Sequence, residues 1–140
     1  MRRVVIDTSL YIDWLNVGRH EDVLFARDAV KYLSAVVILE LYAGARSPRD
    51  RRIVGNVVAA FDRASRLLVP SGMVYEEAGH VLRALQQSRG RQVARSGSLV
   101  NDVLIALSAR SIGATVVTNN ASDFAAIRDV RAFKLTIVPT

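Results

Sequence analysis

Four carboxylates stand in segments of this sequence that are otherwise apolar: Asp7, Glu40, Asp102 and Asp123. An ionised carboxylate in apolar surroundings costs free energy unless a cation or hydrogen-bond donors offset its charge. The chain carries a net charge of +6, so acids gathered into one pocket would hold a divalent cation. Mg2+ or Mn2+ prefers such oxygen ligands, and the four acids therefore indicate metal-assisted phosphodiester chemistry.

Each of these acids also has a structural explanation that the sequence leaves open. Asp7 is a favoured type of N-cap residue for the helical pattern that follows it. Glu40 could form a buried ion pair with an arginine, and Asp102 could interact with the dipole of a helix that begins near it. Asp123 could cap a short helix that runs to about Ile127.

The hydrophobic pattern predicts short apolar strands that alternate with helices. The expected strands are residues 3–7, 35–37, 67–69, 116–117 and 135–138. The expected helices are residues 10–16, 20–33, one that opens at Glu40, 48–65, one after Ser71 to about 88, 98–112 and 123–127. This alternation requires crossover connections and a parallel sheet covered on both faces. We therefore expect an α/β fold, a three-layer α/β/α sandwich with a central, mainly parallel sheet, as a single domain over residues 1–140.

The expected sheet places two of the acids at one edge. Ligands of open parallel sheets gather outside the carboxyl ends of the strands. Asp7 ends the first strand, and the loop of residues 118–123 follows the strand at 116–117. A site at this edge would therefore contain both Asp7 and Asp123.

Composition excludes several other classes of protein. Hydrophobic residues make up 51% of the chain and charged residues 23%, as in globular proteins, and the apolar runs are too short to span a bilayer. Residues 1–3 lead into a strand pattern and not into a signal peptide, so we expect a cytoplasmic protein. The sequence has no cysteine, which removes disulfides, thiolate nucleophiles and cysteine-ligated zinc. His20 and His80 lack the spacing of zinc ligands and are expected to be surface or packing residues.

The basic residues indicate a polyanionic partner. All but two of the 19 are arginine, which pairs with phosphate and stacks on exposed bases, so RNA is the expected partner. Two clusters could follow RNA phosphates, or could simply be solvated surface. They are Arg46, Arg49, Arg51 and Arg52, and Arg89, Arg91 and Arg95.

The order and spacing of the acids resemble those of a known family. The matching motifs are Asp7-Thr8-Ser9, Glu40-Leu41, Asn101-Asp102 with Ile105-Ala106, and Thr118-x-Asn120-x-x-Asp123-Phe124. Over nearly the whole chain they resemble the PIN-domain ribonucleases, especially the VapC-like toxins of type II toxin-antitoxin systems. In the usual last motif of that family a basic residue follows the threonine, whereas Asn119 stands there. This departure bears on substrate contact and not on the metal ligands.

The resemblance implies an endoribonuclease that uses Mg2+ or Mn2+, forms a homodimer and is inhibited by a small antitoxin encoded alongside. Its implied catalytic residues and metal ligands are Asp7, Glu40, Asp102 and Asp123, with Ser9 and Thr118 as supporting hydroxyls. Bound metal would activate water and stabilise charge on the phosphate.

Two other interpretations of the sequence remain. A receiver or haloacid-dehalogenase-like domain also has an aspartate at a strand end. The first expects a lysine near the last strand, where the chain ends Val138-Pro139-Thr140, and the second usually has an aspartate where Ser9 stands. A non-catalytic RNA-binding or regulatory module with the same fold is the other alternative, and four intact carboxylates argue against it.

Overall fold

The computed structural model describes residues 1–89 and 97–140. At its centre is a five-stranded sheet of order β3-β2-β1-β4-β5, in which every described strand pair is parallel. The strands are β1 (Arg2–Ile6), β2 (Ala29–Ser34), β3 (Leu67–Leu68), β4 (Thr115–Thr118) and β5 (Lys134–Ile137). The predicted central parallel sheet is confirmed.

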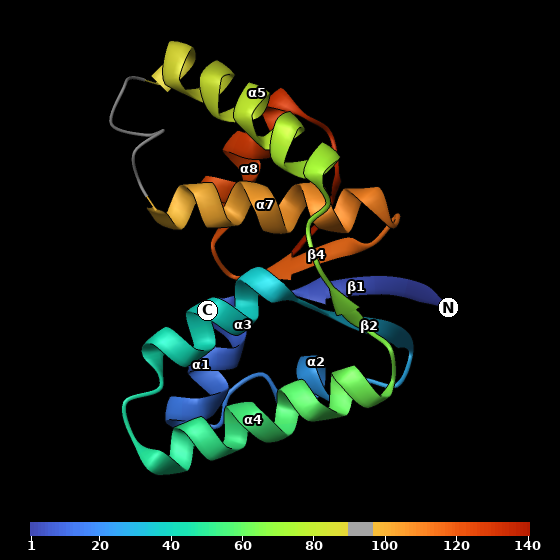
Figure 1. Cartoon of the computed structure of the whole chain (residues 1–140), viewed down its shortest axis with the longest axis vertical. Helices are drawn as coiled ribbons and strands as arrows, with labels where there is room; N and C mark the ends of the chain where they lie inside the picture. The colour runs from blue at the N-terminus through green and yellow to red at the C-terminus, as the bar shows by residue number, and fades with distance from the viewer. Residues whose placement is uncertain (90–96) are drawn as a thin grey trace.

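Helices cover both faces of this sheet. Those in the described residues are α1 (Thr8–Val17), α2 (Glu21–Leu24), α3 (Ala35–Gly44), α4 (Pro48–Arg63), α5 (Gly72–Arg89), α7 (Gly97–Ser111) and α8 (Ala121–Val130). Figure 1 shows α5, α7 and α8 on one side of the strands and α1, α2 and α4 on the other. The fold is therefore the three-layer α/β/α sandwich that the sequence predicts.

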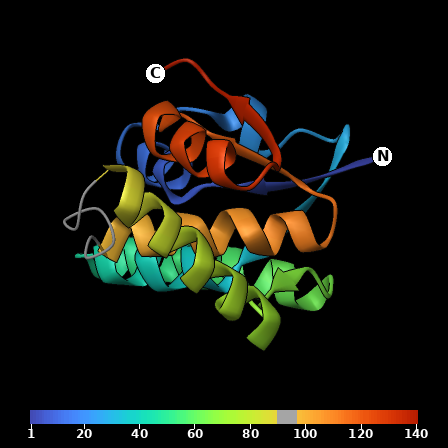
Figure 2. The ribbon, with the colours of Figure 1, turned by 90° about the horizontal axis from the view of Figure 1, so that it is seen from above.

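Helix α7 is the most enclosed helix among those described. It packs against β1 and β4 on one side and against α5 on the other, and Figure 2 shows α5 running diagonally across it. Buried side chains consequently follow one another around α7, from Val103 to Ala109 without interruption. A polar residue on this helix, such as Asp102, is placed in the protein interior.

The sequence of β1 explains its central position. Val4, Val5 and Ile6 are all buried, and β1 has β2 on one side and β4 on the other. A strand with neighbours on both sides and helices on both faces requires apolar residues at consecutive positions. Asp7 follows at once and lies at the carboxyl end of this strand.

The sequence prediction is wrong between residues 20 and 40. Helix α2 ends at Leu24, and the second strand is Ala29–Ser34 and not 35–37. Residues 29–32 pair with β1, and Leu33 and Ser34 are buried, so the ladder hydrogen bonds and burial outweigh the helical spacing of the apolar residues. The Ser34 hydroxyl accepts a hydrogen bond from the Val36 backbone N–H, which starts α3 at Ala35. Glu40 therefore lies within α3 and does not open it.

The other predicted elements agree with the structure to within a few residues. Pro48 begins α4, and the Ser47 hydroxyl caps this helix by accepting a hydrogen bond from the Asp50 backbone N–H. No helix in residues 1–89 and 97–140 is long and apolar enough to cross a membrane.

Candidate active site

Asp7 is held by two hydroxyl groups at the carboxyl edge of the sheet. Only 4% of its surface is exposed. Its Oδ2 accepts hydrogen bonds from Ser9 Oγ at 2.9 Å and from Thr118 Oγ1 at 2.8 Å. Asp7 occupies the N-cap position of α1, but its side chain makes no capping hydrogen bond. The capping explanation of this carboxylate is therefore wrong, and the two hydroxyls fix its orientation instead.

Glu40 is oriented by a hydroxyl from α1. Thr8 Oγ1 donates a hydrogen bond to Glu40 Oε1 at 2.7 Å. Within the described parts of the chain, no arginine forms an ion pair with Glu40. The sequence did not single out Thr8, because a threonine directly after Asp7 is also typical of the start of a helix.

Asp102 is the most perturbed of the four acids. It lies beyond the first turn of α7, so interaction with the helix dipole does not account for it. Its surface is 6% exposed. Burial, followed by the charges of Asp7, Asp123 and Glu40, raises the pKa of Asp102 from 3.8 to about 8. The charges of the other three predicted acids therefore act on Asp102, and together we call the four acids the acidic region.

Asp123 lies in the first turn of α8, where Asn120 and not Asp123 is the N-cap residue. Asn120 Nδ2 donates a hydrogen bond to Asp123 Oδ2 at 3.2 Å, and the Asn120 backbone N–H donates to Thr118 Oγ1 at 2.9 Å. Thr118 thus connects Asn120 with Asp7. The motif from Thr118 to Asp123 therefore orients two acids through a chain of hydrogen bonds.

The chemistry of these donors fits a hard divalent cation. All four are carboxylates, and a cation would relieve their mutual repulsion. In residues 1–89 and 97–140, however, no group of three or more histidine, cysteine, aspartate or glutamate residues is arranged to hold a metal ion. The acidic region is therefore described by the charges that act on Asp102 and by the hydrogen bonds that orient the other three carboxylates.

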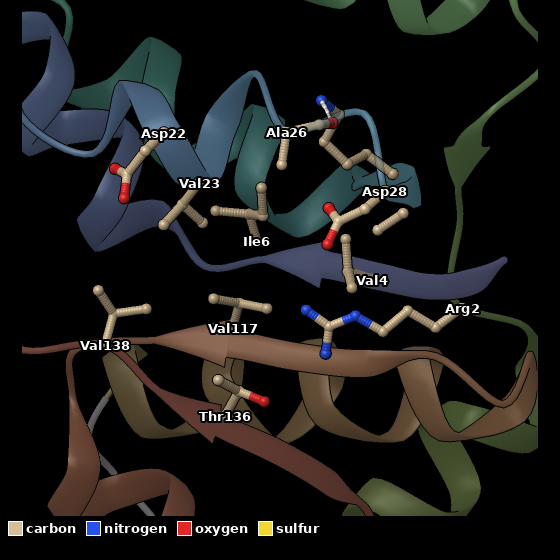
Figure 3. A pocket seen from close by; sticks show the side chains of 12 residues that line it. Arg2, Val4, Ile6, Asp22, Val23, Ala26, Asp28, Val117, Thr136 and Val138 are labelled. Atoms are coloured by element: carbon tan, nitrogen blue, oxygen red, sulfur yellow. Dashed lines mark hydrogen bonds between the residues drawn. The ribbon is translucent and has the colours of Figure 1, made fainter.

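The cavity in Figure 3 is separate from the acidic region. It has a volume of about 200 Å³ and lies between α2 and the strands β1, β4 and β5. Aliphatic side chains such as Ile6, Val23 and Val138 form much of its wall, and none of the four acids lines it. A cavity with aliphatic walls does not suit a phosphate backbone, so it does not replace the acidic region as the candidate active site.

The first basic cluster lies around the start of α4. Arg49, Arg51 and Arg52 are exposed. Arg49 pairs with Asp50 at 3.3 Å, and Arg51 donates a hydrogen bond to the Ala45 backbone oxygen at 3.4 Å. The side chains of Arg89, Arg91 and Arg95, which form the second cluster, lie outside the described residues.

The family of the chain follows from comparison with known proteins. The sequence model of the PIN domain matches residues 4–130. The chain therefore belongs to the PIN domain family. No curated protein matches it.

Several solved structures share the fold over almost the whole chain. A chain of VapBC2 from Rickettsia felis, bound to a DNA fragment from their promoter, is 22% identical with a TM-score of 0.68, over 97% of this chain and 98% of that chain. A chain of DNA-bound VapBC from Salmonella typhimurium is 22% identical with a TM-score of 0.68, over 98% of both chains. A chain of VapBC-5 from Mycobacterium tuberculosis, a member of the VapBC family of toxin-antitoxin systems, is 20% identical with a TM-score of 0.66, over 100% of both chains.

We predict that Asp102→Asn stabilises the protein in a pH-dependent way. The raised pKa means that folding takes up a proton at this carboxyl between about pH 4 and pH 8. The free energy of unfolding therefore falls as the pH rises through this window, and the loss is complete above pH 8. Asparagine does not ionise, so the gain in the free energy of unfolding should be larger above that pH than near pH 5, by about 1–3 kcal/mol.

Thermal and urea unfolding in the presence of a chelator would measure this difference. Asp62→Asn is a suitable control, because Asp62 is exposed on α4 and loses the same charge. Equal gains for Asp102→Asn at the two pH values would contradict the assignment of a shared negative region around Asp102.

Proposed function

We propose that this protein is a metal-dependent endoribonuclease that hydrolyses RNA phosphodiester bonds, and that it is the toxin of a toxin-antitoxin module. The observation that carries the proposal is the grouping of four acids in a PIN fold: hydrogen bonds orient Asp7, Glu40 and Asp123, and the charges of these three act on the buried Asp102. Perturbed acids that share one region are typical of catalytic sites. The positive net charge of +6 agrees with a polyanionic substrate.

In this proposal the four acids hold Mg2+ or Mn2+. The bound ion supplies an activated water and stabilises charge on the phosphate and the leaving oxygen. Ser9 and Thr118 hold one oxygen of Asp7, which directs the rest of that carboxylate into the acidic region. Thr8 orients Glu40 and Asn120 orients Asp123 in the same manner. A bound cation would favour the ionised form of Asp102, because it would offset the burial and repulsion that raise the pKa of this carboxyl.

A non-catalytic RNA-binding or regulatory module remains the alternative. Such a module needs a basic surface but gains nothing from four carboxylates that repel one another. The buried position of Asp7 and Asp102 costs stability without a compensating function. We therefore favour the enzyme.

Asp7→Asn and Asp102→Asn should each abolish metal-dependent RNA cleavage while the protein stays folded. Each change removes a ligand charge with little change in shape, and we expect a loss of at least about 100-fold in rate. Cleavage of a fluorescent single-stranded RNA, with Mg2+ or Mn2+ added or with a chelator, would measure the effect, and thermal unfolding would report the fold.

The exposed Asp62→Asn variant is the matched control and should cleave at the rate of the parent protein. Undiminished cleavage by both site variants would refute the assignment of the acidic region. Absence of any metal-dependent cleavage by the parent protein, together with RNA binding, would favour the non-catalytic module.

We further propose that a basic cluster binds the RNA backbone. Arg49, Arg51 and Arg52 are exposed at the start of α4, and of these Arg52 has no ion pair within the described parts of the chain. The contacts of Arg49 and Arg51 are an exposed ion pair and a long hydrogen bond, which are weak and easily exchanged for phosphate. Arg89, Arg91 and Arg95 are proposed as a second track from their sequence alone.

Replacing Arg49, Arg51 and Arg52 together by glutamine should weaken RNA binding and make it less dependent on salt. Each phosphate contact to single-stranded RNA contributes about 0.7 to the slope of log K against log salt, so three lost contacts should reduce it by about two. Binding would be measured in the Asp7→Asn background, where the RNA is not cleaved. Arg63, Arg66 and Arg128, which are also exposed, provide a control triplet with the same change in charge.

The second cluster, Arg89, Arg91 and Arg95, would be changed in the same way. If both cluster variants keep the affinity and the salt slope of the control triplet, neither cluster binds the RNA backbone.

A small antitoxin is the partner that we propose, and a homodimer is the proposed assembly. The similar structures are of VapBC proteins, one of which is described as a member of a family of toxin-antitoxin systems. The charge of the acidic region supports the same partner independently. An arginine side chain from the antitoxin would find several carboxylates around it, and a guanidinium group pairs with carboxylates through two parallel hydrogen bonds.

Co-expression with the product of the adjacent gene should therefore give a complex that no longer cleaves RNA. Removing the arginine of the antitoxin tail should weaken inhibition more than it weakens binding, because the rest of the interface remains. Light scattering and a nuclease assay of the purified complex would test both statements. A monomer with no co-purifying partner and no relief of toxicity would count against them.

A further inference from the structure

A fifth carboxylate, outside the acidic region, joins three separate segments of the chain. Asp13 lies on α1, and its Oδ2 accepts a hydrogen bond from Asn119 Nδ2 at 3.2 Å. The same oxygen lies 3.1 Å from His20 Nε2. Asn119 follows β4, and His20 lies between α1 and α2. One oxygen atom therefore ties α1 to the loop after β4 and to the connection before α2. We call Asp13, His20 and Asn119 the Asp13 clamp.

Asn119 lies between the two residues that orient Asp7 and Asp123. Thr118 donates to Asp7 through its hydroxyl, and Asn120 donates to Asp123 through its side-chain amide. The planar peptide bonds on both sides of Asn119 leave few free rotations between these donors. A shift of Asn119 would therefore turn both donors away from their acids.

Several contacts fix the conformation of His20 in the Asp13 clamp. His20 has a φ of 67°, in the left-handed region that side chains other than glycine seldom adopt. Its side chain is 9% exposed, and its backbone oxygen accepts hydrogen bonds from the N–H groups of Val23 and Leu24. Such a conformation persists where the surrounding contacts fix it. The His20 ring thus gives Asp13 Oδ2 a fixed neighbour in addition to Asn119.

Asp13 is partly exposed, so its effect on the loop after β4 can be distinguished from its effect on the stability of the fold. Its side chain is 37% exposed, so water screens its carboxylate, and its contacts contribute less to the free energy of unfolding than those of a fully buried carboxylate. Its contacts are with Asn119 and His20 and not with the four acids. Loss of the clamp should therefore change the direction of the loop after β4 much more than it changes the stability of the fold.

We propose that Asp13 is a positioning residue for the acidic region, acting through Asn119 on the orientation of Thr118 and Asn120. The inference rests on the proposed nuclease function and adds to it a residue that touches neither metal nor RNA. A small displacement of catalytic groups lowers the rate of the chemical step far more than it weakens substrate binding.

The first test is steady-state cleavage of a fluorescent single-stranded RNA by four variants. Asp13→Ala and Asn119→Leu should each lower kcat about tenfold and leave KM within about twofold of the parent value. Asn119→Lys keeps a donor that can reach Asp13, so its kcat should stay within about threefold. The double variant Asp13→Ala with Asn119→Leu should have the same kcat as Asp13→Ala alone, because each of the two single changes removes the same hydrogen bond.

The second test does not depend on activity. Amide hydrogen exchange in residues 118–124 should become about tenfold faster in Asp13→Ala, while exchange in β1 and α7 stays unchanged. Asp22→Ala is the matched control, because Asp22 is an exposed acid on α2 outside the clamp, and it should alter neither exchange nor kcat.

The outcomes separate this inference from the function on which it rests. A parent protein that does not cleave RNA refutes the nuclease, whatever the exchange data show. An active parent whose Asp13→Ala variant keeps the parent kcat, or the parent exchange rates in residues 118–124, overturns the clamp. Equal losses of kcat in Asn119→Lys and Asn119→Leu would also overturn it, because the bond to Asp13 would then not be the cause.

Discussion

The repulsion among buried carboxylates is the constraint on which the rest of the site depends. Asp102 is buried on α7 and is surrounded by the charges of Asp7, Asp123 and Glu40, so the folded chain disfavours its ionised form. Buried carboxylates that repel one another lower the free energy of unfolding unless a cation or hydrogen-bond donors offset their charge. The proposed metal ion would offset this repulsion by supplying positive charge.

Hydrogen-bond donors stabilise the other three carboxylates and fix their orientation. Hydroxyls serve Asp7 and Glu40, and an amide serves Asp123. Because these donors bind one oxygen of each carboxylate, they fix its plane without neutralising its charge. The parallel sheet brings the parts together, since Ile6 of β1 lies opposite Val117 of β4 and places Asp7 beside Thr118.

Much of the fold was readable from the sequence, because consecutive apolar residues in short runs are typical of buried parallel strands. The failure between residues 20 and 40 has a physical cause. The apolar residues of 29–34 have helical spacing, and only the pairing with β1 decides that they form a strand. Nothing local to that segment contains this information.

The candidate site also contains residues that the sequence predicts and residues that it does not. The types and order of the four acids were visible in the sequence, and the raised pKa of Asp102 agrees with their grouping. Thr8 and Asn120 stand in the motifs that the sequence shows, but their roles as hydrogen-bond donors were not predicted, because these roles depend on partners brought close by folding. Asp13 and His20 illustrate the same limit, since the loop that contains Asn119 lies far from them along the chain.

The strand order also has a consequence for how the protein is made. The central strand β1 is made before its neighbour β4 and the loop that carries Asp123. Pairing between such distant segments must wait until both are available, and it folds slowly. A nascent chain therefore lacks Asp123 and the Thr118 donor until β4 and the loop after it have been made. The topology therefore separates the synthesis of Asp7 from the completion of the acidic region.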